Sequence, residues 1–268
     1  MLQRKHHYLQ IACNNTLSDA LAIIRQLPPS PRIIIEAGTP LIKQYGINVI
    51  GQLRSAWSHV LGNTQAITPS QLTQEQIASI QSIPFIGKYV SESLRAQTAQ
   101  TNQPTDTGTT TPYIVADLKT IDRGAAEAKI AADAGASAVV AMGSAPIETL
   151  NRFIKTCNEM RIDAMIDMMA VDQPIKVLRK LSTMPKVVIL HRGVDETLDN
   201  KTKTLPIHHI AKIKGSYDVM VAIAGGDTPR EIQSAVFNGA DIVVVWKDFY
   251  SPSESTTALA ASFLKNTR

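Results

Sequence analysis

The segment Tyr113-Ile-Val-Ala-Asp-Leu-Lys-Thr-Ile-Asp122 is a short apolar run that ends in two carboxylates and one lysine. Alternation along a strand places Asp117 and Lys119 on the same face, and Asp122 follows where the chain turns toward the next helix. Apolar segments rarely bury ionised groups unless these are paired or bind a cation. The segment is therefore either a structural salt bridge with Asp122 as a helix N-cap, or part of a functional site.

Short β-branched runs alternate with helical patterns on both sides of this segment, which is typical of repeated βα units and a parallel sheet. The expected strands cover residues 8–13, 32–38, 113–119, 138–142, 164–168, 187–191, 219–223 and 242–246. The expected helices include residues 18–26, 147–160, 174–181 and 229–238. Eight such units indicate an α/β protein built as a (β/α)8 TIM barrel. An open doubly wound sheet is the alternative, although no Gly-x-Gly-x-x-Gly follows any strand.

Residues 55–112 interrupt this rhythm, because no strand pattern follows the second helix over that whole length. The middle of the segment carries helical patterns at 73–83 and 85–94, and residues 96–111 are polar enough to predict a flexible tail. We therefore expect one barrel domain over residues 1–268, with an insertion at 55–112 between the second helix and the third strand. The insertion is either a surface elaboration or a lid or docking element.

The composition is that of an ordinary globular protein, with 268 residues, 44% hydrophobic content and a net charge of +4. Lys and Arg are scattered, so we expect no nucleic-acid partner. No segment has the apolar length of a membrane span and the N-terminus lacks the apolar run of a signal peptide, so we expect a cytoplasmic protein without membrane contact. Cys13 and Cys157 fit buried thiols better than a disulfide framework or a metal site.

Barrel enzymes build their sites at the carboxyl ends of the strands, so polar residues there are candidates by position. In chain order these are Asn14, Glu36, Asp117 with Lys119, Asp167, His191 with Arg192, Gly225-Gly226-Asp227 and Lys247-Asp248. Glu36 and Asp117, from adjacent strands, could share Mg²⁺ or another divalent cation, which prefers oxygen ligands. The structural alternatives are a lysine partner for Glu36 and a core role for His191.

Three further groups complete the expected chemistry. Lys119 beside the ion would stabilise negative charge on a substrate oxygen, and His191 could move protons near neutral pH. Gly225 and Gly226, followed by Thr228-Pro229 at a helix start, would offer backbone N–H groups to a phosphate. This combination suits enediolate chemistry on a phosphorylated substrate.

Residues 117–122 match the Asp-x-Lys-x-x-Asp motif of the orotidine-monophosphate decarboxylase superfamily. The chain resembles the 3-hexulose-6-phosphate synthase branch of that superfamily outside residues 55–112. The similarity is carried by Leu9-Gln-Ile-Ala12, Glu36-Ala-Gly-Thr-Pro-Leu-Ile42, Ala116-Asp-Leu-Lys-Thr120 and Ala224-Gly-Gly226.

The resemblance implies a Mg²⁺-dependent aldol reaction that joins formaldehyde to ribulose 5-phosphate, or the reverse reaction. By position, Glu36 and Asp117 would hold the metal, Lys119 would stabilise the 1,2-enediolate and His191 would carry protons. Asp122 would reach into the site of the neighbouring subunit, so the resemblance also implies a homodimer with shared active sites. The residues expected to contact substrate are Asn14, Gly225, Gly226 and Lys247.

Sister activities differ at a few positions. Orotidylate decarboxylases continue the motif with Ile-Pro-Asn-Thr where this chain has Arg123-Gly124, and ketogulonate-phosphate decarboxylases carry an arginine where it has Val194. Two positions also depart from the synthases: Asn14 replaces an aspartate, and Trp246-Lys247 replaces the Gly-Arg that holds phosphate. A related sugar-phosphate decarboxylase or epimerase therefore stays open, as does a non-catalytic barrel that docks partners through residues 55–112.

Overall fold

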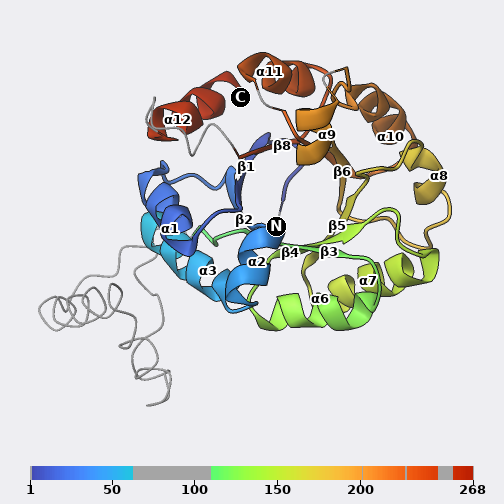
Figure 1. Cartoon of the computed structure of the whole chain (residues 1–268), viewed down its shortest axis with the longest axis horizontal. Helices are drawn as coiled ribbons and strands as arrows, with labels where there is room; N and C mark the ends of the chain where they lie inside the picture. The colour runs from blue at the N-terminus through green and yellow to red at the C-terminus, as the bar shows by residue number, and fades with distance from the viewer. Residues whose placement is uncertain (1, 63–109, 201, 227, 247–255, 268) are drawn as a thin grey trace, which may run out of the picture. The chain divides into compact units, whose positions relative to one another are not determined.

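The computed structural model describes residues 2–62, 110–200, 202–226, 228–246 and 256–267. Within that part of the chain, eight parallel strands form a closed barrel in sequence order, with β8 pairing back to β1 (Figure 1). The strands are β1 Tyr8–Cys13, β2 Ile33–Ala37, β3 Ile114–Thr120, β4 Ala138–Met142, β5 Asp163–Asp167, β6 Val187–His191, β7 Met220–Ala224 and β8 Ile242–Val245. Each predicted strand is confirmed to within one residue at either end. The predicted barrel is confirmed and the open sheet is excluded.

The helices surround the ring of strands in Figure 1. They are α1 Leu17–Gln26, α2 Thr39–Tyr45, α3 Val49–Val60, α6 Gly124–Asp133, α7 Ile147–Glu159, α8 Pro174–Leu178, α9 Val194–Asp199, η2 Ile207–His209, α10 Ile210–Ser216, α11 Pro229–Phe237 and α12 Thr256–Asn266. Helix α8 ends earlier than the predicted residue 181, because the N–H groups of Lys180 and Leu181 bond to carbonyls three residues back and close the chain into a turn.

The strands are buried on both faces, so the barrel has two separate cores. Side chains alternate along each strand: Leu9 and Ile11 of β1 pack outward under the helices, while Tyr8 and Ala12 point into the barrel. The inner core is completed by Ile34, Val115, Ala138, Val140, Met165, Val187, Ile189, Met220, Ala222, Ala224, Ile242 and Val244, with Leu2 beside them. Both cysteines are buried, as expected, and neither forms a disulfide bond in the part of the chain that the structure describes.

The carboxyl end of β3 departs from regular strand geometry. Its register against β4 shifts between Ala116 and Thr120, and Lys119 has a positive φ of 49°. Such a bulge bends a strand and re-aims its side chains. Lys119 therefore reaches the barrel mouth from a bulge rather than from the regular alternation that the sequence predicts.

The chain divides into one compact unit of residues 1–62 and 111–268, which contains the barrel, and a second unit of residues 63–110. The helices expected at 73–83 and 85–94 lie outside the described residues, as does the expected flexible tail up to residue 109. Helix α3 extends through residues 55–60, the start of the expected insertion. None of the described helices has the length and apolar character needed to cross a membrane.

Candidate active site

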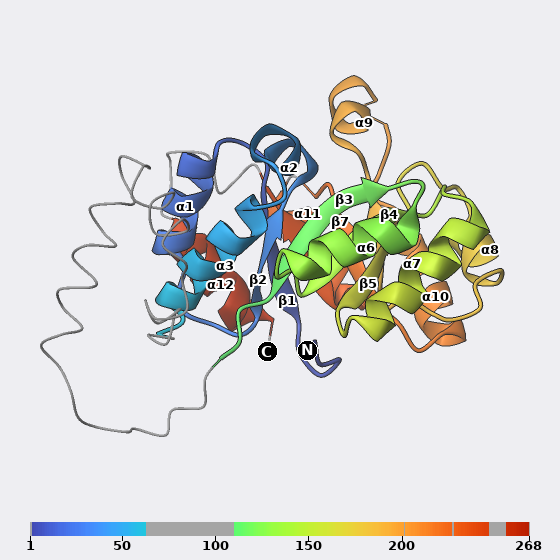
Figure 2. The same cartoon turned by 90° about the horizontal axis from the view of Figure 1, so that it is seen from below.

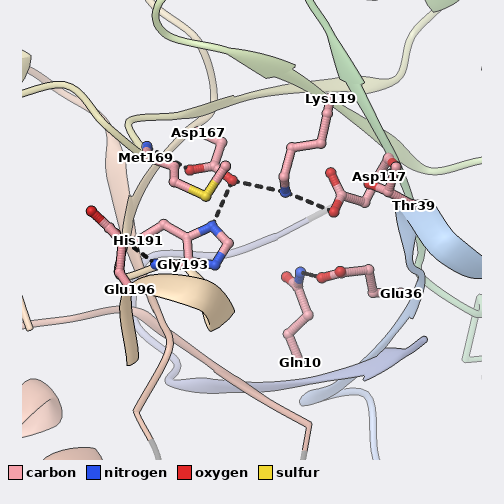
Figure 3. A network of polar contacts seen from close by, with 10 residues as sticks. All are labelled: Gln10, Glu36, Thr39, Asp117, Lys119, Asp167, Met169, His191, Gly193 and Glu196. Carbon is pink, nitrogen blue, oxygen red and sulfur yellow. Dashed lines mark hydrogen bonds and ion pairs between the residues drawn. The ribbon is translucent and has the colours of Figure 1, made fainter. Parts of the chain in front are cut away.

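A cavity of about 500 Å³ opens at the carboxyl ends of the strands, and every strand contributes to its wall. Helices α2 and α9 flank this end of the barrel in Figure 2. The apolar side chains that line the cavity include Val140, Ile189 and Val244. The polar lining is concentrated in a network of hydrogen bonds and ion pairs drawn in Figure 3. This is the end of the barrel at which the sequence predicts the site.

Lys119 lies between the carboxylates of Asp117, on its own strand β3, and Asp167, on β5 (Figure 3). Its Nζ is 2.7 Å from Oδ2 of Asp117 and 2.9 Å from Oδ2 of Asp167. Burial alone would lower the pKa of Lys119, but Asp117, Asp167 and more weakly Glu36 hold it above its ordinary value. The ammonium group therefore stays charged at any physiological pH and is fixed at the centre of the site.

Asp167 connects Lys119 to His191. Its Oδ2 also lies 2.8 Å from Nδ1 of His191, and its Oδ1 accepts a 2.9 Å hydrogen bond from the backbone N–H of Met169. Burial would raise the pKa of Asp167, yet attraction and hydrogen bonding from His191, followed by those from Lys119, hold it well below its usual range. An ionised carboxylate only accepts, so the proton of His191 sits on Nδ1 and Nε2 is left to exchange protons in the cavity.

Glu36 is buried on the opposite side of Lys119 from Asp167 (Figure 3). The side-chain amide of Gln10 donates a hydrogen bond from Nε2 to Oε2 of Glu36. Burial, and then the negative charge of Asp117, raise the pKa of Glu36 from 4.5 to about 7, against the lowering influence of Lys119, Gln10 and His191. The single positive charge of Lys119 therefore does not fully offset the negative charges of Glu36 and Asp117.

The carboxylates of Glu36 and Asp117 are suited to bind a divalent cation, as one oxygen of Asp117 indicates. Oδ1 of Asp117 is buried and has no hydrogen-bond partner among the described residues. A cation between the two carboxylates would satisfy that oxygen and offset the repulsion that raises the pKa of Glu36. In the described part of the chain no three His, Cys, Asp or Glu side chains group closely enough to hold an ion by themselves. An ion here would complete its shell with water and substrate oxygens, as Mg²⁺ commonly does.

The structure brings most of the predicted site residues together. Seven of them line this cavity, namely Asn14, Glu36, Asp117, Lys119, His191, Gly225 and Gly226. Trp246 also lines it. Lys247 lies outside the described residues. Asp122 is exposed and does not line the cavity of its own chain.

Two glycines at the cavity rim are required by close packing. A Cβ on Gly38 would overlap the side chain of Asn14, so Gly38 lets Asn14 lie across the start of α2. Gly225 has a φ of +88°, and a Cβ there would overlap the carbonyl oxygen of Arg192. The carbonyl of Gly225 also accepts a 2.6 Å hydrogen bond from Nη2 of Arg192. The turn after β7 is therefore tied to the end of β6.

Three residues of the site had no predicted role. Asp167 was a strand-end candidate by position, but its pairing with His191 joins residues 24 apart in sequence and could not be read from spacing. Thr39 donates a 2.7 Å hydrogen bond to the backbone carbonyl of Asp117 and connects α2 to β3. For Gln10 the sequence contained one indication of a role in the site: strand alternation places it on the same face as Asn14, four residues later.

Comparison with protein families shows which family the chain belongs to. A model of the "Orotidine 5'-phosphate decarboxylase / HUMPS family" matches residues 111–252, which is more than half of the chain. The chain belongs to this family.

Relatives of this family member include two curated proteins named "Bifunctional enzyme Fae/Hps". The one from Methanococcoides burtonii is 35% identical over 240 residues, which cover 89% of this chain and 48% of the relative. The one from Archaeoglobus fulgidus is 34% identical over 242 residues, covering 89% and 47%. The chain spans about half the length of the curated relatives it matches.

Solved structures share the family's barrel. The 3-hexulose-6-phosphate synthase of Salmonella typhimurium superposes with a TM-score of 0.67 at 19% identity, covering 97% of this chain and 100% of that one. A structure of the KGPDC of Streptococcus mutans superposes with a TM-score of 0.66 at 18% identity, covering 99% of each chain. At such identities the likeness establishes the fold.

Proposed function

We propose that the chain is a Mg²⁺-dependent aldehyde-lyase of the 3-hexulose-6-phosphate synthase type, which interconverts ribulose 5-phosphate plus formaldehyde with 3-hexulose 6-phosphate. The observation that carries the proposal is the position of Lys119, charged and held between Asp117 and Asp167 beside the buried Glu36. A fixed positive charge at this point matches the negative charge that develops on an enediolate. The names of the bifunctional relatives support the same activity.

Glu36 and Asp117 would hold the divalent cation, which when bound would polarise substrate oxygens and favour loss of a proton from the adjacent carbon. Lys119 would stabilise the negative oxygen of the 1,2-enediolate. Carbon 1 of the enediolate then attacks the carbonyl carbon of formaldehyde, a carbon–carbon bond forms, and the new alkoxide takes up a proton. His191 would carry protons through Nε2, and the contact of its Nδ1 with Asp167 supports this role.

The phosphate of the substrate would lie at the turn after β7. Gly225 and Gly226 line the cavity there, immediately before α11, whose N-cap Thr228 accepts a hydrogen bond from the N–H of Glu231. A glycine turn that leads into a helix offers backbone N–H groups to an anion. On the evidence of the sequence, Lys247 would add a positive charge, and Asn14 would contact a sugar hydroxyl.

The functional molecule is proposed to be a homodimer in which Asp122 completes the partner's site. This rests on the resemblance of residues 117–122 to the family motif and is compatible with the exposure of Asp122 in the single chain. We propose no catalytic role for residues 63–110.

The test is an assay of the purified chain with ribulose 5-phosphate and formaldehyde, in the presence of Mg²⁺ or of EDTA. We expect consumption of formaldehyde with Mg²⁺ and none with EDTA. The absence of metal-dependent consumption would refute the proposal. Release of carbon dioxide from 3-keto-gulonate 6-phosphate would instead assign the sister decarboxylase activity.

A further inference from the structure

Gln10 is an amide in the interior of the barrel, where apolar side chains are the rule. It lies in the middle of β1, in register with Ile34 of β2 and Val244 of β8, and is only 1% exposed. Tyr8 and Ala12, its inward-facing neighbours on the strand, belong to the inner core. A polar side chain in this position loses its hydration, so each of its polar atoms needs a partner.

One half of the Gln10 amide has such a partner and the other has none. Nε2 donates to Glu36, and since a carboxylate accepts hydrogen bonds, this contact fixes which end of the amide faces Glu36. Oε1 is therefore turned away from Glu36, as Figure 3 shows. It is buried and has no hydrogen-bond partner among the described residues. Gln10 is also one of the residues that line the cavity, so this buried oxygen lies beside the space that a ligand would occupy.

The chemistry of an amide oxygen narrows the choice of ligand group. It accepts hydrogen bonds only, so it has no favourable contact with an ionised phosphate or carboxylate, which also only accept. A hydroxyl group can donate to it. Within a sugar phosphate, the group that fits Oε1 belongs to the polyol chain near the carboxylates, whereas the phosphate belongs at the glycine turn after β7.

We propose that Gln10 is a substrate-binding residue whose Oε1 accepts a hydrogen bond from a hydroxyl of the sugar chain, while its Nε2 holds Glu36 in place. This inference rests on the proposed function, because it assumes a phosphorylated polyol as the ligand. It adds to the expected substrate contacts one that lies deeper in the barrel than Asn14.

Isothermal titration calorimetry without formaldehyde, at limiting and at saturating Mg²⁺, tests the assignment. The ligands are ribulose 5-phosphate and inorganic phosphate. The proteins are wild type, Gln10→Met, the milder Gln10→Asn, and Gln52→Met as the matched control. Gln52 on α3 also carries a buried amide oxygen without a partner in the described part of the chain, but it does not line the cavity.

At saturating Mg²⁺ we expect Gln10→Met and Gln10→Asn to weaken binding of ribulose 5-phosphate about tenfold, the loss typical of one neutral hydrogen bond, and to leave inorganic phosphate unchanged. Gln52→Met should bind both ligands as wild type does. Circular dichroism identifies any variant that fails to fold. If Gln10→Met does not fold, the comparison of Gln10→Asn with wild type is the test.

Three outcomes would overturn the assignment. Equal affinity of wild type and both Gln10 variants for ribulose 5-phosphate would show that Oε1 makes no contact. A loss that is seen at limiting Mg²⁺ and disappears at saturating Mg²⁺ would mean that Gln10 acts only by positioning Glu36. If wild type binds no ribulose 5-phosphate, the proposed function itself is wrong and the assignment falls with it.

Discussion

Lys119 carries the positive charge that three carboxylates of the site share, and its removal leaves Glu36, Asp117 and Asp167 without that charge. We predict that Lys119→Ala lowers kcat for the formaldehyde reaction by about a thousandfold, the upper range for loss of one stabilising group at a developing oxyanion. Steady-state kinetics, together with circular dichroism to confirm the fold, measures the effect. The matched control is Lys129→Ala, which breaks an exposed pair with Asp133 on α6 and should leave kcat unchanged. Full activity in a folded Lys119→Ala protein would contradict the assignment and favour a non-catalytic barrel.

Glu36 gives the site a specific pH dependence. Its pKa is raised from 4.5 to about 7, so the folded protein holds a proton there that the unfolded chain has already released. Without metal, the free energy of unfolding should therefore fall as pH rises between these two values.

In the proposed site, the cation is bound by the ionised form of Glu36. We predict that Mn²⁺ affinity rises about tenfold per pH unit below pH 7 and then levels off. Electron paramagnetic resonance titration measures the free ion. In Glu36→Gln the affinity should be low and nearly independent of pH. A wild-type affinity that is flat from about pH 5.5 to 8 would argue against Glu36 as a ligand.

At the scale of elements, the turn after β7 depends on the left-handed conformation of Gly225. We predict that Gly225→Ala lowers the free energy of unfolding by more than about 1 kcal/mol, because it strains the backbone and forces Arg192 to move. It should also weaken ribulose 5-phosphate binding. Urea unfolding and calorimetry measure the two effects.

Gly226→Ala is the matched control for this turn. A Cβ on Gly226 would lie 3.5 Å from Cδ1 of Leu205, an ordinary contact, and its φ is not in the left-handed range. This variant should be close to wild type in stability. Equal losses in both variants would show that the turn tolerates no side chain at all, rather than depending on Gly225.

The strands could be predicted from the sequence because each is a short β-branched run such as Val187–His191, buried on both faces. The strand-end rule then located Glu36, Asp117, Lys119 and His191 correctly at one mouth of the barrel. Other features of the site could not be predicted, because they depend on distances between separate strands. These are the bulge that places Lys119 between two carboxylates, and the Asp167–His191 and Gln10–Glu36 pairs. Periodicity within one segment carries no such information.

At the scale of the whole molecule, the proposed homodimer makes a prediction about mixed subunits. Lys119→Ala and Asp122→Ala homodimers should each be inactive. Random mixing by unfolding and refolding should restore about a quarter of wild-type activity, because half of the dimers are mixed and each of these has one intact site. No recovery in a mixture that sedimentation shows to be dimeric would refute a shared site.

The proposed reaction requires the site to form and stabilise an enediolate. Proton NMR of ribulose 5-phosphate in D₂O with Mg²⁺, without formaldehyde, tests it most directly, since reversible loss of a C1 proton exchanges it for deuterium. We predict that wild type exchanges one C1 proton and that EDTA or Lys119→Ala abolishes the exchange. Retention of both C1 protons by the folded, Mg²⁺-loaded wild-type protein would contradict the account.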